Sequence, residues 1–142
     1  MSVGTYRGTV FPWHCDHMGH MNVMWYVGKF DEATWHLFAT IGITHGYMRE
    51  TGHVLGAVQQ NITYAKELVA GDIVEVRSRF VEIRDRVVRF EHEMLNSSTG
   101  EIVARCMQTT VHIDAASRRA APFPASIRAA AEKAIVEGKD AA

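Results

Sequence analysis

The sequence has no excess of charge of either sign and no long apolar run. Its 142 residues carry 15 lysines and arginines against 16 aspartates and glutamates, so it lacks the broad positive field that nucleic-acid backbones select. No stretch approaches the apolar length that crosses a bilayer, and no apolar export signal opens the chain. We therefore expect neither nucleic acid nor membrane as a partner.

Cysteine is also scarce. Cys15 and Cys106 lie far apart and form no spaced framework, which is typical of a reducing compartment rather than of a secreted, disulfide-stapled protein. We predict a cytoplasmic location. No repeat or low-complexity linker divides the chain, and its length suits one domain. The sequence thus predicts a single domain over residues 1–142, with its core at about residues 5–113 and a C-terminal tail at about 115–142.

Hydrophobic periodicity predicts a strand, a long helix and then a strand meander. A row of β-branched and aromatic residues over 5–13 predicts the first strand. Apolar residues then recur at spacings of three and four over 23–41, as on one face of a helix, with Asn22 as its N-cap and Gly42 at its end. A helical turn is expected near 47–50 and a peripheral helix in the tail. The remaining strands are predicted at 53–64, 73–83, 87–95 and 102–113.

The densest collection of reactive side chains lies where the predicted first strand ends and the long helix begins. It reads Trp13-His14-Cys15-Asp16-His17-Met18-Gly19-His20-Met21-Asn22. A helix N-terminus presents free amides and the positive end of the macrodipole, so it stabilises a carbonyl oxygen that gains negative charge during acyl transfer. Thioester hydrolysis needs such donors and a carboxylate that attacks the carbonyl or activates water. Asp16 and the amides near Val23 are candidates for these two parts.

The same segment resembles the hotdog-fold acyl-CoA thioesterases of the 4-hydroxybenzoyl-CoA thioesterase-like family. The resemblance is carried by the run from Asp16 to Asn22, by Trp25-Tyr26 and by Phe30-Asp31-Glu32-Ala33, and it covers about residues 5–113. It implies an α+β hotdog fold, in which an antiparallel five- to six-stranded sheet wraps around a long central helix. It further implies an acyl-CoA substrate and a homodimer with shared active sites, often paired into a dimer of dimers.

The resemblance also implies residue roles. Asp16 would be the nucleophile or general base, and the backbone amide of Val23 would contribute to the oxyanion hole. The candidate substrate-binding residues are His17, Asn22, Trp25 and Tyr26. The chemistry needs no metal or redox cofactor. The acyl group, its length, and the choice between CoA and acyl carrier protein as the thiol carrier stay open.

Three other functions compete with this interpretation. A non-catalytic hotdog module would bind acyl-CoA as a sensor or assembly element, but it has no need for a carboxylate beside the helix end. A zinc site would use the ligand-type residues between His14 and His20, although neighbours in an extended segment point to opposite faces. A hydratase would use Asp31 and His36, which do not face each other well on a helix.

Two groups of side chains bear on how a substrate is held. Aromatic residues near the motif either pack in the core or line an acyl pocket, where they would hold a cationic acyl group such as a betaine by cation–π attraction: Trp13, Trp25, Tyr26 and Trp35. Arginines around one predicted hairpin either meet the CoA phosphates or protect strand edges: Arg77, Arg79, Arg84, Arg86 and Arg89.

Overall fold

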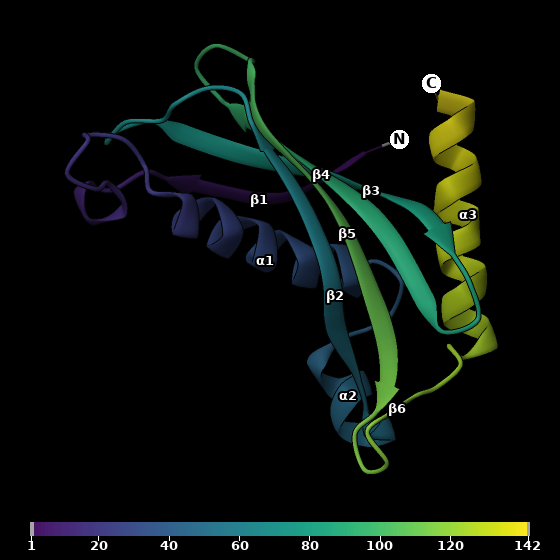
Figure 1. Ribbon diagram of the computed structural model, residues 1–142. Coiled ribbons are helices and arrows are strands. Elements are labelled where there is room, and N and C mark those ends of the chain that lie inside the picture. The colour runs from purple at the N-terminus through teal and green to yellow at the C-terminus, as the bar shows by residue number, and fades with distance from the viewer. Residues whose placement is uncertain (1, 142) are drawn as a thin grey trace.

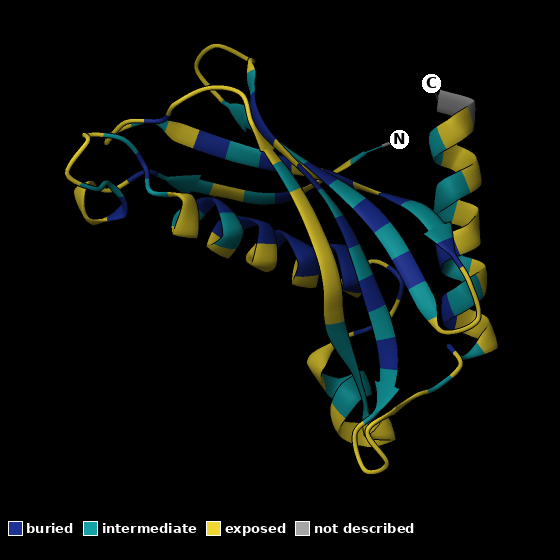
Figure 2. Ribbon diagram, viewed as in Figure 1, coloured by how far each residue is buried: buried dark blue, intermediate teal, exposed yellow. Residues whose placement is uncertain are grey.

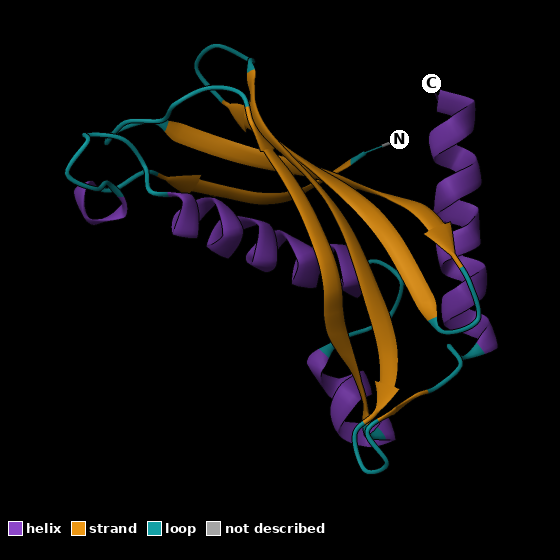
Figure 3. Ribbon diagram, viewed as in Figure 1, coloured by secondary structure: helices purple, strands orange, loops and turns teal. Residues whose placement is uncertain are grey.

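The structure is a computed structural model that describes residues 2–141, in which a curled antiparallel sheet wraps around one long helix (Figure 1). The strands are β1 (Val3–Thr9), β2 (His53–Tyr64), β3 (Ile73–Ile83), β4 (Val87–Asn96), β5 (Ile102–Asp114) and β6 (Arg119–Ala120). Their order is β1-β3-β4-β5-β2, and β6 pairs with β5. The helices are the 3-10 helix η1 (Pro12–His14), α1 (Val23–Ala39), α2 (His45–Thr51) and α3 (Ala125–Ala141). Figure 3 shows the strands as one continuous curled layer, with α1 lying along its curve.

Helix α1 lies in the concave face of the sheet and buries one side of its length (Figure 2). It begins after Asn22, whose side chain caps it as predicted. Tyr26, Phe30 and Ala33 share one buried cluster with β3 and β4 residues, while Leu37 and Phe38 belong to a second cluster toward the other end. Each fully buried side chain of this size contributes roughly 1.5–3 kcal/mol. This packing fixes the position of the α1 N-terminus relative to the sheet.

Several predicted boundaries differ from the structure by one to four residues. The first strand ends at Thr9 rather than at Trp13, because Pro12 has no N–H to donate to a ladder and instead opens η1. Helix α1 ends at Ala39, two residues before its predicted end, and Gly42 follows with a φ of +94°. Helix α2 is longer than one turn because Thr44 caps its N-terminus.

The C-terminal helix adds to the core. Strand β1 pairs with β3 only as far as Ser78, and α3 packs beside β3. Ile127 and Ala131 of α3 are buried in the same cluster as Phe80 of β3. Helix α3 therefore encloses the part of the core that β1 does not reach.

A polar side chain network crosses the core between α1 and the sheet. His92 of β4 is fully buried, and its two ring nitrogens lie 2.8 Å from Thr34 Oγ1 and 2.5 Å from Ser78 Oγ. Burial lowers the pKa of His92 to about 4, so the ring is neutral at pH 7. The folded state thus holds a histidine that resists protonation.

Strand β2 forms one edge of the sheet and is largely exposed over its second half (Figure 2). It pairs with β5 along its length, so its other edge keeps unpaired backbone groups. Within residues 2–141, no helix is long and apolar enough to span a bilayer.

Candidate active site

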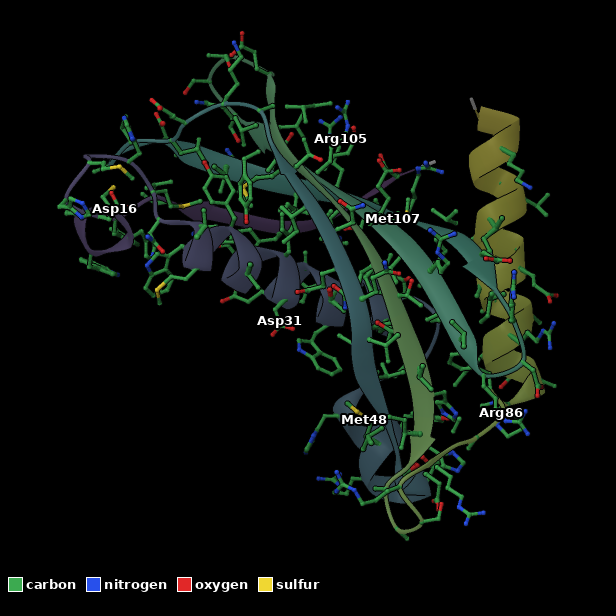
Figure 4. All side chains as sticks on the ribbon, viewed as in Figure 1. Asp16, Asp31, Met48, Arg86, Arg105 and Met107 are labelled. Atoms are coloured by element: carbon green, nitrogen blue, oxygen red, sulfur yellow. The ribbon has the colours of Figure 1, made fainter. Side chains whose placement is uncertain are left out.

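Asp16 lies in the loop between η1 and α1, at one end of the molecule (Figure 4). Backbone hydrogen bonds make this loop a closed turn: the Asp16 amide donates to His20 O at 3.0 Å, and the Gly19 amide donates to Asp16 O at 3.0 Å. Gly19 has a φ of +86°, which suits a residue without a side chain. The Met21 amide donates to Leu68 O at 2.8 Å, which ties the turn to the segment after β2. The position of Asp16 is therefore fixed from both sides.

The Asp16 carboxylate accepts one hydrogen bond on each oxygen. Asn22 Nδ2 donates to Oδ2 at 3.0 Å, and the Met18 amide donates to Oδ1 at 2.9 Å. The hydrogen bond from Asn22 and then that from Met18 hold the pKa of Asp16 below its usual value. The carboxylate is consequently ionised at neutral pH while half-buried.

Asn22 links this carboxylate to the first turn of α1. Its Oδ1 accepts the Met24 amide at 3.0 Å, and its carbonyl oxygen accepts the Trp25 amide at 3.0 Å. Within residues 2–141, the Val23 amide has no acceptor. One side chain thus caps the helix, orients Asp16 and leaves Val23 as the free donor of the first turn.

A cavity of about 680 Å³ opens beside these groups. One wall comes from the loop and α1, and the other from the end of β2 and the segment after it. Tyr26 and Tyr64 meet edge to face with ring centroids 5.1 Å apart. His20 Nε2 lies 2.9 Å from Glu67 Oε2 across the two walls. The polar and aromatic lining comprises Asp16, His20, Asn22, Tyr26, Tyr64, Lys66 and Glu67, and Val23 also lines the cavity.

The structure brings together four of the six predicted site residues: Asp16, Asn22, Val23 and Tyr26. His17 is exposed and does not line this cavity. Trp25 packs on His14 with ring centroids 4.4 Å apart and lines a different cavity. Substrate binding by His17 or Trp25 stays a prediction.

The second wall of the cavity is not predicted by any sequence pattern. Tyr64, Lys66 and Glu67 lie more than 40 positions after Asp16 in the chain, and no local motif marks them. Tyr26 donates its hydroxyl to Lys66 O at 3.2 Å, which holds this wall against α1. Burial, with smaller contributions from Tyr64 and nearby carboxylates, raises the pKa of Tyr26 to about 12, so the hydroxyl stays protonated.

The side chains that a zinc site or a hydratase would use contact other partners in the structure. His14 Nδ1 accepts the Phe11 amide at 3.0 Å, and His20 pairs with Glu67. Over residues 2–141, no three residues of metal-ligand type are grouped so that they could hold an ion. On α1, Asp31 is exposed whereas His36 Nδ1 contacts Thr5 O. The two therefore do not meet as a hydratase pair.

The arginines of the β3–β4 hairpin each have a carboxylate partner. These pairs are Arg77–Glu75, Arg79–Glu91, Arg84–Glu82, Arg86–Asp85 and Arg89–Glu82. None of them lines the cavity beside Asp16. Arg86 lies at the opposite end of the molecule from Asp16 (Figure 4). The lysine that does line the cavity is Lys66.

Comparison with known proteins identifies the family. A family model described as the thioesterase-like superfamily matches residues 10–131. The chain belongs to this superfamily. The predicted resemblance to hotdog-fold thioesterases is therefore confirmed.

Relatives of this thioesterase-like protein carry thioesterase names. The betainyl-CoA thioesterase of Pseudomonas aeruginosa is 27% identical over 90% of this chain and 80% of its own length. The L-carnitine dehydrogenase/betainyl-CoA thioesterase of Agrobacterium fabrum is 30% identical over 79% of this chain, which spans only 23% of that longer protein. Together, the family and its relatives support acyl-CoA thioesterase activity and identify a thioester hydrolase.

Solved structures of low sequence identity share the fold. A Staphylococcus aureus protein solved in complex with CoA superposes with a TM-score of 0.88 at 18% identity, covering 96% of this chain and 86% of that one. This likeness confirms the predicted hotdog fold of the thioesterase-like chain.

Proposed function

We propose that the protein hydrolyses an acyl-CoA thioester, with Asp16 as the catalytic carboxylate and the Val23 amide as an oxyanion donor. One observation carries this assignment: Asn22 bonds both Asp16 and the first turn of α1, whose free amide belongs to Val23. Asp16 and Val23 also line the same cavity. A carboxylate and a helix-end donor are the two parts that thioester hydrolysis needs.

In this mechanism the thioester carbonyl lies between the two groups. Its oxygen accepts the Val23 N–H, which stabilises the negative charge that develops as the carbonyl carbon is attacked. Asp16 either attacks that carbon, forming an anhydride that water then hydrolyses, or removes a proton from the attacking water. The carbon–sulfur bond breaks, CoA leaves as the thiolate, and water supplies the second oxygen of the acid.

The hydrogen bonds from Asn22 and Met18 lower the pKa of Asp16, so the carboxylate is ionised and available for either role. The same bonds hold the carboxylate in one orientation, which suits a nucleophile that must align with a carbonyl carbon.

The acyl group that we propose first is cationic. Both named relatives are betainyl-CoA thioesterases, and the cavity of this chain has two tyrosine rings, Tyr26 and Tyr64, on facing walls. Aromatic faces attract quaternary ammonium groups, and the Glu67 carboxylate lies at the same cavity. A betainyl group fits this combination better than a plain short acyl chain does.

We propose a homodimer that forms through β2, with a dimer of dimers as a further assembly. The free edge of β2 offers backbone groups for pairing with a second copy, and Val58 on this strand is 62% exposed. We propose that the same partner covers a hollow of about 390 Å³ between α1 and α2, which Trp35 and Met48 line. Light scattering after gel filtration should give twice or four times the chain mass.

A thiol-release assay over a panel of acyl-CoA esters tests the proposed function. Betainyl-CoA should be turned over faster than acetyl-CoA or benzoyl-CoA, and Asp16→Asn should lower the turnover of the best substrate at least about a hundredfold. A protein that binds these esters without releasing thiol from any of them would instead be a non-catalytic acyl-CoA-binding module. Unchanged turnover by Asp16→Asn would remove Asp16 from the mechanism.

A further inference from the structure

A second cavity, of about 340 Å³, lies between β1, η1 and α1. It shares no lining residue with the cavity beside Asp16. Five of its lining residues carry rings and one carries an ammonium group: Tyr6, Phe11, Trp13, His14, Trp25 and Lys29. The catalytic proposal uses none of these side chains.

Lys29 is the buried cation of this cavity. It is 4% exposed, and its Nζ donates to Tyr6 Oη at 3.0 Å and lies 5.2 Å from the Tyr6 ring centroid. In the described part of the chain no carboxylate forms an ion pair with it. An ammonium has three donors, and a buried charge without a partner is costly. A bound anion would complete this site.

His14 supplies a second unused donor. It is 8% exposed, and because its Nδ1 accepts the Phe11 amide, the ring proton sits on Nε2. Among residues 2–141, Nε2 finds no acceptor, yet the atom is not sealed inside the protein. Burial and the Lys29 charge both lower the pKa of His14, which keeps the ring neutral at pH 7. A neutral N–H donor therefore lies near the Lys29 ammonium.

Aromatic rings form the rest of the cavity. Phe11 and Trp13 stack with centroids 4.5 Å apart and an interplanar angle of 11°, although Trp13 is 66% exposed. Gly8 is part of this arrangement, since a Cβ there would lie 2.2 Å from Tyr6 Oη, the atom that receives the Lys29 bond. Flat apolar walls of this kind accept flat ligands.

We propose that this second cavity binds a small planar monocarboxylate, whose carboxylate contacts Lys29 Nζ and His14 Nε2 and whose flat body lies among the rings of Phe11, Trp13 and Trp25. One ammonium and one imidazole N–H match the two oxygens of a carboxylate. The site lacks the arginine fork that favours phosphate. Glu32 also lines the cavity, and its negative charge repels every anion in proportion to the anion's charge, which favours a monoanion over a dianion.

Calorimetric titration of benzoate into the full chain tests the proposal, with the neutral isostere benzamide as the comparison ligand. Lys29→Met keeps the length of the apolar stem and removes the charge. Lys66→Met, which makes the same change in the cavity beside Asp16, is the matched control. We expect benzoate to bind the native chain and Lys66→Met with similar affinity, and Lys29→Met at least about tenfold more weakly. Benzamide should bind native chain and Lys29→Met alike.

Fluorescence gives an independent readout. Trp35→Phe leaves Trp13 and Trp25 as the remaining tryptophans of the three, and both line the second cavity. Benzoate should change their emission over the concentrations at which it binds by calorimetry. This readout keeps the test valid should Lys29→Met fail to fold.

Three results would overturn the proposal. One is benzoate affinity that Lys29→Met leaves unchanged. Another is affinity lost in Lys66→Met and kept in Lys29→Met, because the carboxylate then occupies the cavity beside Asp16. The third is binding to the native chain weaker than about 1 mM, or no stronger than that of benzamide. None of these measurements involves thioester hydrolysis, so they leave the proposed function untouched.

Discussion

Replacing Asn22 by serine separates the two roles of its side chain, which caps α1 and orients Asp16. A serine hydroxyl is as good a helix cap as the Asn22 amide oxygen, but it is too short to replace the Nδ2 donor that lies 3.0 Å from Asp16 Oδ2. The carboxylate would then keep only the Met18 amide as a partner. Asn22→Ser therefore tests orientation of Asp16 at nearly constant stability.

The expected size of the effect follows from the geometry. Loss of one of the two orienting bonds frees the carboxylate to turn, and a displacement of about 1 Å at a reacting group costs up to about a hundredfold in rate. We expect kcat/KM to fall by about 10- to 100-fold in Asn22→Ser. Because the Asn22 bond is the largest cause of the lowered pKa of Asp16, the acidic limb of the pH–rate profile should move to higher pH.

Stopped-flow thiol release across the pH range measures both effects, with thermal unfolding as the stability readout. Asn22→Ala, which loses the cap as well, should lose about 1 kcal/mol of stability and show the same kinetic defect. Thr44→Ala serves as the matched control, because Thr44 caps α2 away from the site. A pH profile and a kcat/KM in Asn22→Ser that match the native protein would refute the reasoning.

Two further predictions concern substrate choice and stability. Tyr64→Leu should lower kcat/KM for betainyl-CoA about 5- to 30-fold more than it lowers kcat/KM for acetyl-CoA, because one aromatic face of the cavity is lost. Equal losses for both esters in thiol-release assays would argue against cation–π selection. The folded pKa of His92, about 4, lies below the unfolded value of about 6.5, so the unfolded state binds the proton first. Stability should therefore be lost as pH falls from about 6.5 to 4, by up to about 3 kcal/mol. Urea unfolding should show this loss in the native protein and less of it in His92→Gln, and an equal loss in both would contradict the assignment.

The half of the candidate site that comes from one continuous segment could be predicted from the sequence. Asn22 before an apolar helical period predicts the cap, and Asp16 follows from the chemistry of a carboxylate beside a helix end; the structure places both at the cavity. The resemblance implies the same substrate-binding role for Trp25 and Tyr26, which are neighbours in the chain. Adjacent helix positions differ by about 100°, so these side chains face different cavities.

The opposite wall could not be predicted because long-range packing forms it. Glu67 reaches His20 only after β2 has paired with β5 and curled over α1. The same limit applies to Lys29, which sequence periodicity gives no reason to single out, since its burial depends on the approach of Tyr6 from β1. Local patterns thus predicted the elements and the loop that carries Asp16, whereas tertiary contacts determined which side chains share a cavity.

The most direct test of the central claim is the split between catalysis and binding in Asp16→Asn. Asparagine keeps the size of the side chain and removes the carboxylate, which we propose as the group that attacks the thioester. We predict that kcat falls at least about a hundredfold while the affinity for the intact ester, measured by calorimetry on the inactive variant, changes less than about threefold. A variant that retains native kcat, or that loses activity only because it no longer binds the ester, would contradict the catalytic role of Asp16.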